Sequence, residues 1–349
     1  MQRTSVLWVA ILVLLLSACD DRTPGNPLGS AQASEPADES SLEAAFAASL
    51  KKAEAGDASE QLAVGEAYLV GKGVAKNAVK AVAWYSKAAE QGDAVAQYKL
   101  GLMAIMMFYN SEGVAKDAAE AAALWFKLAA EQGNVPAQFS LGQMYARGHG
   151  VAKDAARAVE WYTKAAEQGS AGAQYELGVM FTNGEGVAKD AAIAEAWYRK
   201  AAEQGDADAQ NSLGLTYLNG EGVAKDATKA AAWYRRAADQ GHVRAQFNLG
   251  LMYAGGQGVA KDDAKAVAWW TKAAKQGFAY AQFNLGVMYR NGEGVPRDFI
   301  RAYILFNLAA AQGHDAAKHA RDVVEAELTP AERAEGQRRA SGWKLGDTP

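Results

Sequence analysis

A glycine that follows leucine or valine recurs along this chain at a nearly constant spacing, and this spacing constrains the fold more than any other feature. The recurring glycines are Gly65, Gly101, Gly142, Gly178, Gly214, Gly250 and Gly286, so five of the six separations are 36 residues and one is 41. The period lies among the lengths of helical repeats, and Val, Ile and Thr are too sparse for strands. The sequence therefore predicts an all-α chain that repeats one helical hairpin about seven times.

A second marker agrees with this register. Gln-Gly pairs end, with the same separations, at Gly92, Gly133, Gly169, Gly205, Gly241, Gly277 and Gly313. Because two independent markers step together, the repeats are expected to span residues 57–313 as one continuous solenoid, in which each unit contacts only its neighbours.

Residues 170–205 serve as the type unit. In its first part, one face of a helix contains Gln174, Leu177, Gly178 and Phe181, and Gly178 has no side chain, so a neighbouring helix can approach closely. Gly184 and Gly186 then tolerate positive φ and turn the chain. A second helix follows, in which the large ring of Tyr198 stands between small side chains. The Gln-Gly pair ends this helix.

An N-cap residue is expected at the start of each second helix. The predicted caps are Asn77, Asp117, Asp154, Asp190, Asp226, Asp262 and Asp298.

These residues together follow the pattern A-Q-x-x-L-G-x-x-[YF]-x-x-G-x-G-V-x-x-D-x-x-x-A-x-x-[WY]-[YF]-x-K-A-A, which closely resembles the Sel-one-like repeat, a relative of the tetratricopeptide repeat. The resemblance implies an α/α solenoid wound as a right-handed superhelix, with the first helices on its concave side. Residues 42–56 align only with a second helix and are expected to form an N-terminal cap. Residues 314–349 are expected to close the other end with charged cap helices and a tail.

The N-terminus carries one arginine, an apolar run from Val6 to Leu16, and then the only cysteine of the chain. The apolar run is too short to span a bilayer, so residues 1–18 are predicted to be a signal peptide. The sequence Leu16-Ser17-Ala18-Cys19 resembles the lipobox of bacterial lipoproteins, which implies lipidation of Cys19 after cleavage. An ordinary signal peptide with an incidental cysteine is the alternative.

Residues 19–41 are rich in Pro, Gly, Ser and acidic side chains, so they are predicted to be a disordered tether. Asp20 and Asp21 resemble a signal that retains lipoproteins in the inner membrane. The expected location is the periplasmic face of the bacterial envelope, with the inner membrane favoured over the outer membrane.

Composition argues against nucleic acid as a ligand, because the formal net charge is −4 and no part of the chain is strongly basic. The four histidines, His149, His242, His314 and His319, lack a metal-ligand spacing and are interpreted as solvated or capping residues. The chain shows no nucleophile with a base at reachable spacing, so neither catalysis nor a cofactor is expected. The resemblance leaves β-lactam hydrolysis as a less favoured alternative, since the relatives associated with it have paired cysteines.

A candidate partner-binding surface is the ladder formed by the residue two before each Leu-Gly leucine. Its rungs are Leu62, Tyr98, Phe139, Tyr175, Asn211, Phe247 and Phe283. Large rigid side chains can anchor a peptide or stack on sugar rings. The competing interpretation is that these rings belong to the packing of the repeat itself.

Two departures from the repeat provide further candidates. The second unit is four residues longer between Leu100 and Val114, about one helical turn, and the resulting extension consists of Ile105, Met106, Met107, Phe108 and Tyr109. It is either an adaptable contact surface or a local repacking. Polar side chains that could bind carboxylates or hydroxyls form the second set: Arg147, Asn183, Asn219, Arg244, Arg290 and Asn291. They can equally be solvated helix ends.

The leading hypothesis is thus a lipid-anchored, non-enzymatic adaptor that binds a protein or peptide of the cell envelope. Binding of peptidoglycan or an exported polysaccharide is the alternative.

Overall fold

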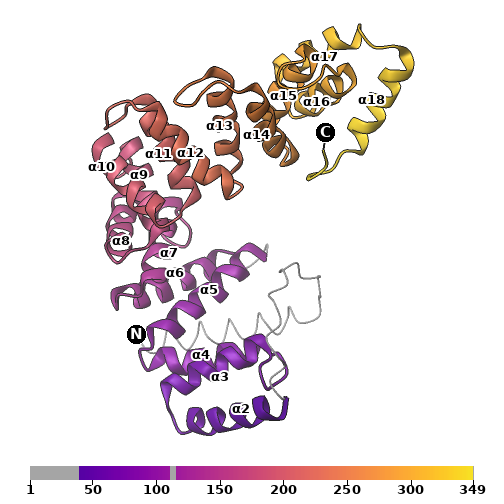
Figure 1. The fold of residues 1–349 in the computed structure, drawn as a ribbon. Coiled ribbons are helices and arrows are strands. Elements are labelled where there is room, and N and C mark those ends of the chain that lie inside the picture. The colour runs from indigo at the N-terminus through magenta and orange to yellow at the C-terminus, as the bar shows by residue number, and fades with distance from the viewer. Residues whose placement is uncertain (1–38, 111–114, 349) are drawn as a thin grey trace. The chain divides into compact units, whose positions relative to one another are not determined.

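The computed structural model describes residues 39–110 and 115–348, and within these residues it contains only helices and turns (Figure 1). The first helices of the seven hairpins are α3 Ala58–Val70, α5 Ala94–Asn110, α7 Val135–Arg147, α9 Ala171–Asn183, α11 Ala207–Asn219, α13 Val243–Gly255 and α15 Ala279–Asn291. The second helices are α4 Ala78–Glu90, α6 Ala115–Glu131, α8 Ala155–Glu167, α10 Ala191–Glu203, α12 Ala227–Asp239, α14 Asp263–Lys275 and α16 Phe299–Ala311. The predicted α solenoid of helical hairpins is therefore confirmed.

The chain divides into two compact units. The first runs to Ala173 and includes the turn Glu185–Val187, and the second contains Gln174–Gly184 and everything from Ala188 onward.

Side-chain caps start most of the helices. The second helices α4, α8, α10, α12, α14 and α16 are capped as predicted by Asn77, Asp154, Asp190, Asp226, Asp262 and Asp298. For Asp117 the prediction was wrong. The second helix of the longer repeat, α6, begins at Ala115, so Asp117 lies inside its first turn. There its carboxylate faces the positive end of the helix dipole.

A buried ring from each second helix packs on the glycine of the preceding first helix. A Cβ atom on Gly142 would lie 2.6 Å from Cδ1 of Tyr162, and one on Gly286 would lie 2.7 Å from Cε1 of Phe306. These rings are almost fully buried, so the glycine is what lets the two helices of a hairpin approach each other.

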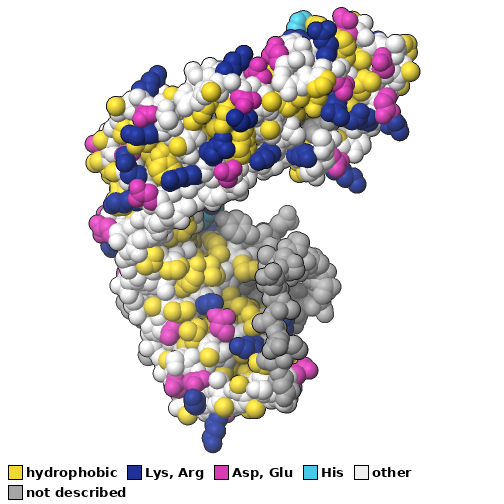
Figure 2. Space-filling model, viewed as in Figure 1, with side chains coloured by type: hydrophobic (Ala, Val, Ile, Leu, Met, Phe, Trp, Pro, Cys, Tyr) yellow, Lys and Arg dark blue, Asp and Glu magenta, His cyan; other side chains and the backbone are white. Residues whose placement is uncertain are grey.

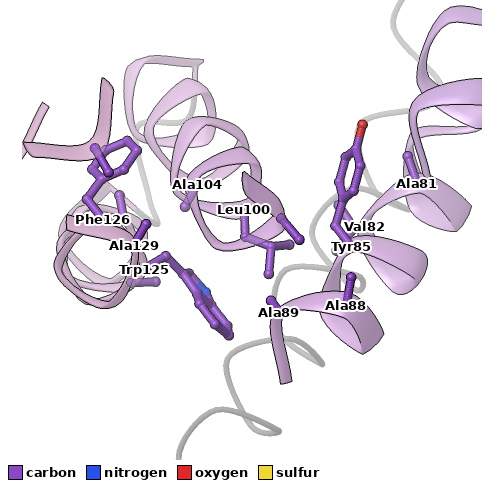
Figure 3. Packing of buried hydrophobic residues seen from close by; sticks show 14 of the residues in the cluster. Ala81, Val82, Tyr85, Ala88, Ala89, Leu100, Ala104, Trp125, Phe126 and Ala129 are labelled. Carbon is purple, nitrogen blue, oxygen red and sulfur yellow. The ribbon is translucent and has the colours of Figure 1, made fainter. Parts of the chain in front are cut away.

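The core within the first unit is built from small side chains around a few large ones. Figure 3 shows Leu100 of α5 lying between side chains of α4, such as Ala89, and side chains of α6, such as Trp125. Both Leu100 and Ala89 are buried. Alanine-rich second helices thus allow close packing of successive hairpins.

Buried glutamines join successive repeats through hydrogen bonds. Gln210 donates through Nε2 to the carbonyl oxygen of Ala202 in the preceding repeat, at 3.0 Å. Its Oε1 accepts a hydrogen bond from Nε2 of Gln240 at 2.8 Å. The same arrangement recurs at Gln97, Gln138, Gln246 and Gln282. These repeats, including the longer repeat two, are therefore held to their neighbours by satisfied buried amides as well as by apolar contacts.

Flanking helices cover the ends of the repeats. The N-terminal helix α2, Glu39–Glu54, begins inside the segment expected to be the tether and offers the carbonyl of Ala53 to Gln61, at 3.1 Å. At the other end, α17 Asp315–Glu325 and α18 Pro330–Gly342 pack on α16, and Gly336 lies against Tyr303. No helix in the described part of the chain is long and apolar enough to cross a membrane.

Candidate interaction surface

The ladder of the first unit packs mainly against its own repeats. The ring of Tyr98 lies 5.7 Å from that of Phe126, and the ring of Phe139 lies 5.8 Å from that of Tyr162, both in tilted geometry. Leu62 is partly buried against the same core. These rungs are half-buried, so each presents only part of its surface to a partner.

The ladder of the second unit begins in the same way. The ring of Tyr175 lies 5.9 Å from that of Tyr198, and Asn211 accepts a hydrogen bond from Nδ2 of Asn248 at 3.3 Å. Burial raises the pKa of Tyr175, and the nearby Asp208 carboxylate raises it further. Tyr175 therefore stays neutral at physiological pH.

Phe247 breaks this pattern. In its repeat the second-helix ring is Trp270, whose Nε1 donates to the carbonyl oxygen of Phe247 at 3.1 Å. The Phe247 ring itself contacts the next repeat, with centroids 5.3 Å from Phe278 and 6.2 Å from Tyr280. Phe247 thus belongs to a cluster that spans two repeats.

This aromatic cluster consists of Phe247, Phe278, Tyr280, Phe283 and His314. Tyr280 lies 5.6 Å from Phe278 and 5.0 Å from His314, and Phe283 stacks on His314 at 4.6 Å. The members come from α13, from α15 with its N-cap residue Phe278, and from the N-cap residue of α17, His314. The side chain of Tyr280 is 58% exposed, so the cluster is open to solvent.

One member of the cluster, Phe278, occupies the N-cap position of α15. Other first helices with a described cap begin at a side chain that accepts a backbone hydrogen bond, as Asp57, Asn134, Asp206 and His242 do. Phe278 occupies this position in α15 and makes no side-chain cap hydrogen bond. Replacing a cap by an apolar residue costs about 1 kcal/mol. Repeat seven therefore carries an aromatic ring where helix stability favours a polar side chain.

Sequence reasoning missed Phe278, Tyr280 and His314 as members of one surface. The signal was present, because Phe278 stands 36 residues after the capping His242 and breaks the series of polar caps. His314 does cap α17, accepting from the backbone N–H of Ala317 at 3.3 Å, while its ring stacks on Phe283.

The two first helices that precede α15 carry charged side chains near their N-termini. Arg244 is exposed in the first turn of α13, one repeat before Tyr280 in register. Nε2 of His242 lies 3.1 Å from the carboxylate of Asp208. Burial raises the pKa of the neighbouring cap Asp206. The first helices that precede the cluster thus expose both a guanidinium group, on Arg244, and a carboxylate, on Asp208.

A second feature is a pocket in the first unit. It is lined by Leu102, Ile105, Phe126, Ser140, Gln143, Met144, Arg147 and His149, and its volume is about 180 Å³. The pocket brings together Ile105 from the repeat-two extension and Arg147 from the polar set. Figure 2 shows hydrophobic side chains gathered over α5 to α7, the helices that surround this pocket.

The extension itself is visible as a longer helix. α5 has 17 residues where each of the six other first helices has 13, which agrees with one added turn. Met106 is 62% exposed. The side chains of Met107, Phe108 and Tyr109 lie outside the described residues, as does Cys19.

The remaining polar candidates lie at the C-terminal ends of first helices. Asn219 donates to Glu221 at 3.0 Å, and Asn291 donates to Glu293 at 2.9 Å, so both close their own turn. Arg290 donates to Asn291 at 3.2 Å. Asn183 occupies the corresponding exposed position in α9. Arg147 differs because it lines a pocket. Within the described residues, no group of three or more His, Cys, Asp and Glu side chains is arranged to hold a metal ion.

Comparison with known proteins decides the family. The Sel1 repeat model matches seven consecutive segments, at residues 58–93, 94–134, 135–170, 171–206, 207–242, 243–278 and 279–314. The chain belongs to the Sel1 repeat family. Sel1 repeat proteins are generally protein-interaction scaffolds, and their fold is typically non-catalytic.

Solved structures of Sel1 repeat proteins are similar to the chain. A protective antigen of uropathogenic Escherichia coli with an SLR fold is 33% identical, with a TM-score of 0.76, over 85% of this chain and 64% of that protein. The chain thus spans less than two thirds of that antigen's length. A Sel1 repeat protein of Oxalobacter formigenes is 35% identical, with a TM-score of 0.65, over 81% of each chain. No curated protein matches the chain.

Proposed function

We propose that this Sel1 repeat protein is a non-enzymatic scaffold that binds a protein or peptide partner on the face formed by its first helices. The observation that carries the proposal is the exposed aromatic cluster of repeat seven. At the N-cap position of α15, Phe278 makes no capping hydrogen bond, and its ring lies beside that of Tyr280. If this surface bound no partner, a polar cap such as His242 of the preceding first helix would stabilise the same turn better than Phe278 does.

Aromatic side chains anchor protein interfaces because they bury a large area and lose little conformational entropy. In the cluster, Phe247 and Phe283 are held by neighbouring rings, so their rotamers are restricted before a partner arrives. Such pre-ordering reduces the entropy lost on binding. The cluster is therefore suited to act as a binding hot spot.

We further propose that the protein is lipid-anchored through Cys19 in the bacterial envelope and faces the periplasm, with the inner membrane favoured. The support is the lipobox-like sequence that ends at Cys19, followed by the Pro- and Ser-rich residues 20–38. Nineteen residues separate Cys19 from the start of α2 at Glu39, so the anchor would hold the repeats near the membrane.

Crosslinking in cells, followed by mass spectrometry, tests the scaffold and its anchor together. We expect the unsubstituted chain to fractionate with membranes and to crosslink to envelope proteins. Cys19→Ser should release the chain from the membrane and reduce the recovery of these partners. Membrane fractionation that is unchanged by Cys19→Ser would rule out the lipid anchor, and an absence of crosslinked partners would rule out the scaffold.

A glycan ligand is a second candidate, favoured by the exposed flat ring of Tyr280, which could stack on a sugar. Peptidoglycan and the organism's exported polysaccharide are the probes for a pull-down with the purified chain. Retention that is lost on Tyr280→Ala would support a glycan ligand. Protein crosslinks from the cluster without such retention would support the scaffold.

A further inference from the structure

The pocket between α5 and α7 is lined in part by side chains that depart from the repeat pattern. Gln143 lines it, whereas the same position of later repeats carries an aliphatic residue, as at Val179, Leu215, Leu251 and Val287. Ile105, the first residue of the repeat-two extension, stands in α5 where repeat three has alanine. The pocket thus combines a polar substitution in one repeat with a larger apolar side chain in the preceding repeat.

The turn after α7 carries a different charge from the corresponding turns. Three later repeats have the sequence Asn-Gly-Glu, at residues 183–185, 219–221 and 291–293. In the last two the asparagine donates a hydrogen bond to the glutamate. Repeat three instead has Arg147, Gly148 and His149, and both side chains line the pocket. A carboxylate is therefore replaced by an imidazole, and a neutral amide by a guanidinium group.

From these observations we infer that the pocket binds the C-terminal residue of a partner polypeptide. The aliphatic side chain of that residue lies among Leu102, Ile105, Phe126 and Met144. Its α-carboxylate is bound by Arg147 and His149, with Ser140 and Gln143 as further hydrogen-bond donors. This inference rests on the proposed function, because it names the part of the partner that the scaffold recognises.

The volume of the pocket is enough for the side chain of one ligand residue. Its volume is about 180 Å³. For comparison, an apolar cavity of about 150 Å³ holds one benzene molecule. Phe126 and Met144 are almost fully buried, so they form a fixed apolar base, while Arg147 is exposed at the rim. A leucine, isoleucine or valine side chain fits this space.

The charges limit the ligand further. No acidic side chain is among the described residues that line the pocket, and guanidinium groups bind carboxylates in paired hydrogen bonds. The apolar base and the basic rim belong to one small pocket. A ligand for this pocket therefore carries a carboxylate next to an aliphatic side chain. In a polypeptide, the C-terminal residue is the one that carries a free carboxylate and its side chain on the same Cα atom.

Fluorescence anisotropy with the full chain in detergent tests this assignment. The probes are labelled hexapeptides that end in Ala-Ala-Leu, either with a free carboxylate or as the C-terminal amide. We expect the free acid to bind at least about tenfold more tightly, as a charge-assisted hydrogen-bonded contact provides. Peptides that end in Gly should bind more weakly than those that end in Leu, and Ile105→Ala should reduce this difference.

The chain supplies its own matched variants. Arg147→Asn with His149→Glu installs the Asn-Gly-Glu turn that three other repeats already use, so folding is expected to be preserved. This variant should bind the acid and the amide equally. Asn219→Arg with Glu221→His transfers the basic turn to repeat five as a control for general electrostatic attraction. That control should leave the acid preference of the pocket unchanged.

Three results would overturn the inference: equal binding of acid and amide by the unsubstituted chain, an acid preference that persists without Arg147 and His149, or no binding of any of the peptides at about 1 mM, the weak limit of specific recognition. If partners are crosslinked in cells but the acid preference is absent, only the inference fails. If the acid preference is present but no partner is crosslinked, the scaffold proposal fails while the pocket assignment stands. The comparison of acid with amide on the unsubstituted chain decides the matter even if a variant does not fold.

Discussion

Replacing Gly250 by alanine is expected to lower the free energy of unfolding by about 1–3 kcal/mol, the usual effect of overpacking a core. A Cβ atom at this position would lie 2.6 Å from Cδ1 of Trp270, a side chain that is only 4% exposed. Trp270 has little room to move, because its Nε1 is hydrogen-bonded to the carbonyl oxygen of Phe247. Urea unfolding followed by tryptophan fluorescence measures the change.

The same helix provides a control for the effect of removing a glycine. Gly255 is the last residue of α13, and the nearest atom to a Cβ there is 3.7 Å away, in the flexible side chain of Gln257. Gly255→Ala should therefore stabilise the chain by up to about 1 kcal/mol, since alanine favours helix. If both substitutions stabilise, the close approach of Trp270 to α13 is not what requires glycine at position 250.

Replacing Phe278 by histidine together with Tyr280 by arginine is expected to reduce partner binding by about 30-fold, the equivalent of roughly 2 kcal/mol at a hot spot. The two new residues are those that repeat six carries at His242 and Arg244. His242 caps its helix, so the variant should also gain about 1 kcal/mol of stability from the restored cap.

This double variant separates function from folding because the two effects have opposite signs. Partner recovery after crosslinking and thermal unfolding should be measured on the same preparation. Val323→Ala, which removes another exposed hydrophobic side chain from α17 in the same unit, serves as the control and should change neither quantity appreciably. Undiminished partner binding by the double variant would contradict the assignment of the cluster as an anchor.

The fold could be predicted from the sequence because the same residue types recur at the same positions in seven repeats. The glycine series, the Gln-Gly pairs and the capping aspartates each specify one local feature, and the structure places most of them as expected. Asp117 was misplaced because repeat two is longer, so its second helix begins before the usual cap position. Errors arose where the register changed.

The candidate surfaces were harder to predict because they depend on contacts between repeats. Arg147 alone resembles a solvated helix end, and Ile105 alone resembles a packing residue. Only the packing of α5 beside α7 places both at one pocket. Likewise, the N-cap position of Phe278 could be read from the sequence, but its contact with Phe247 depends on how successive first helices lie.

Repetition also separates architecture from function in the second helices. A tryptophan followed three residues later by a cation occurs at Trp84, Trp161, Trp197, Trp233 and Trp269, and each cation lies over its ring. Because these pairs recur in register, they are explained by local helix stability. The aromatic cluster instead joins two repeats through Phe247 and departs from the cap rule at Phe278, so it is the better candidate for a specific contact.

Photocrosslinking at Tyr280 in living cells tests the scaffold proposal most directly. A benzophenone amino acid at this position, in the otherwise unsubstituted chain, should form a covalent adduct with a discrete envelope protein. The same probe at Thr228, an exposed position on the second helix α12, should not form this adduct. Equal adducts from both positions, or none from Tyr280, would contradict the proposal that the aromatic cluster binds a protein partner.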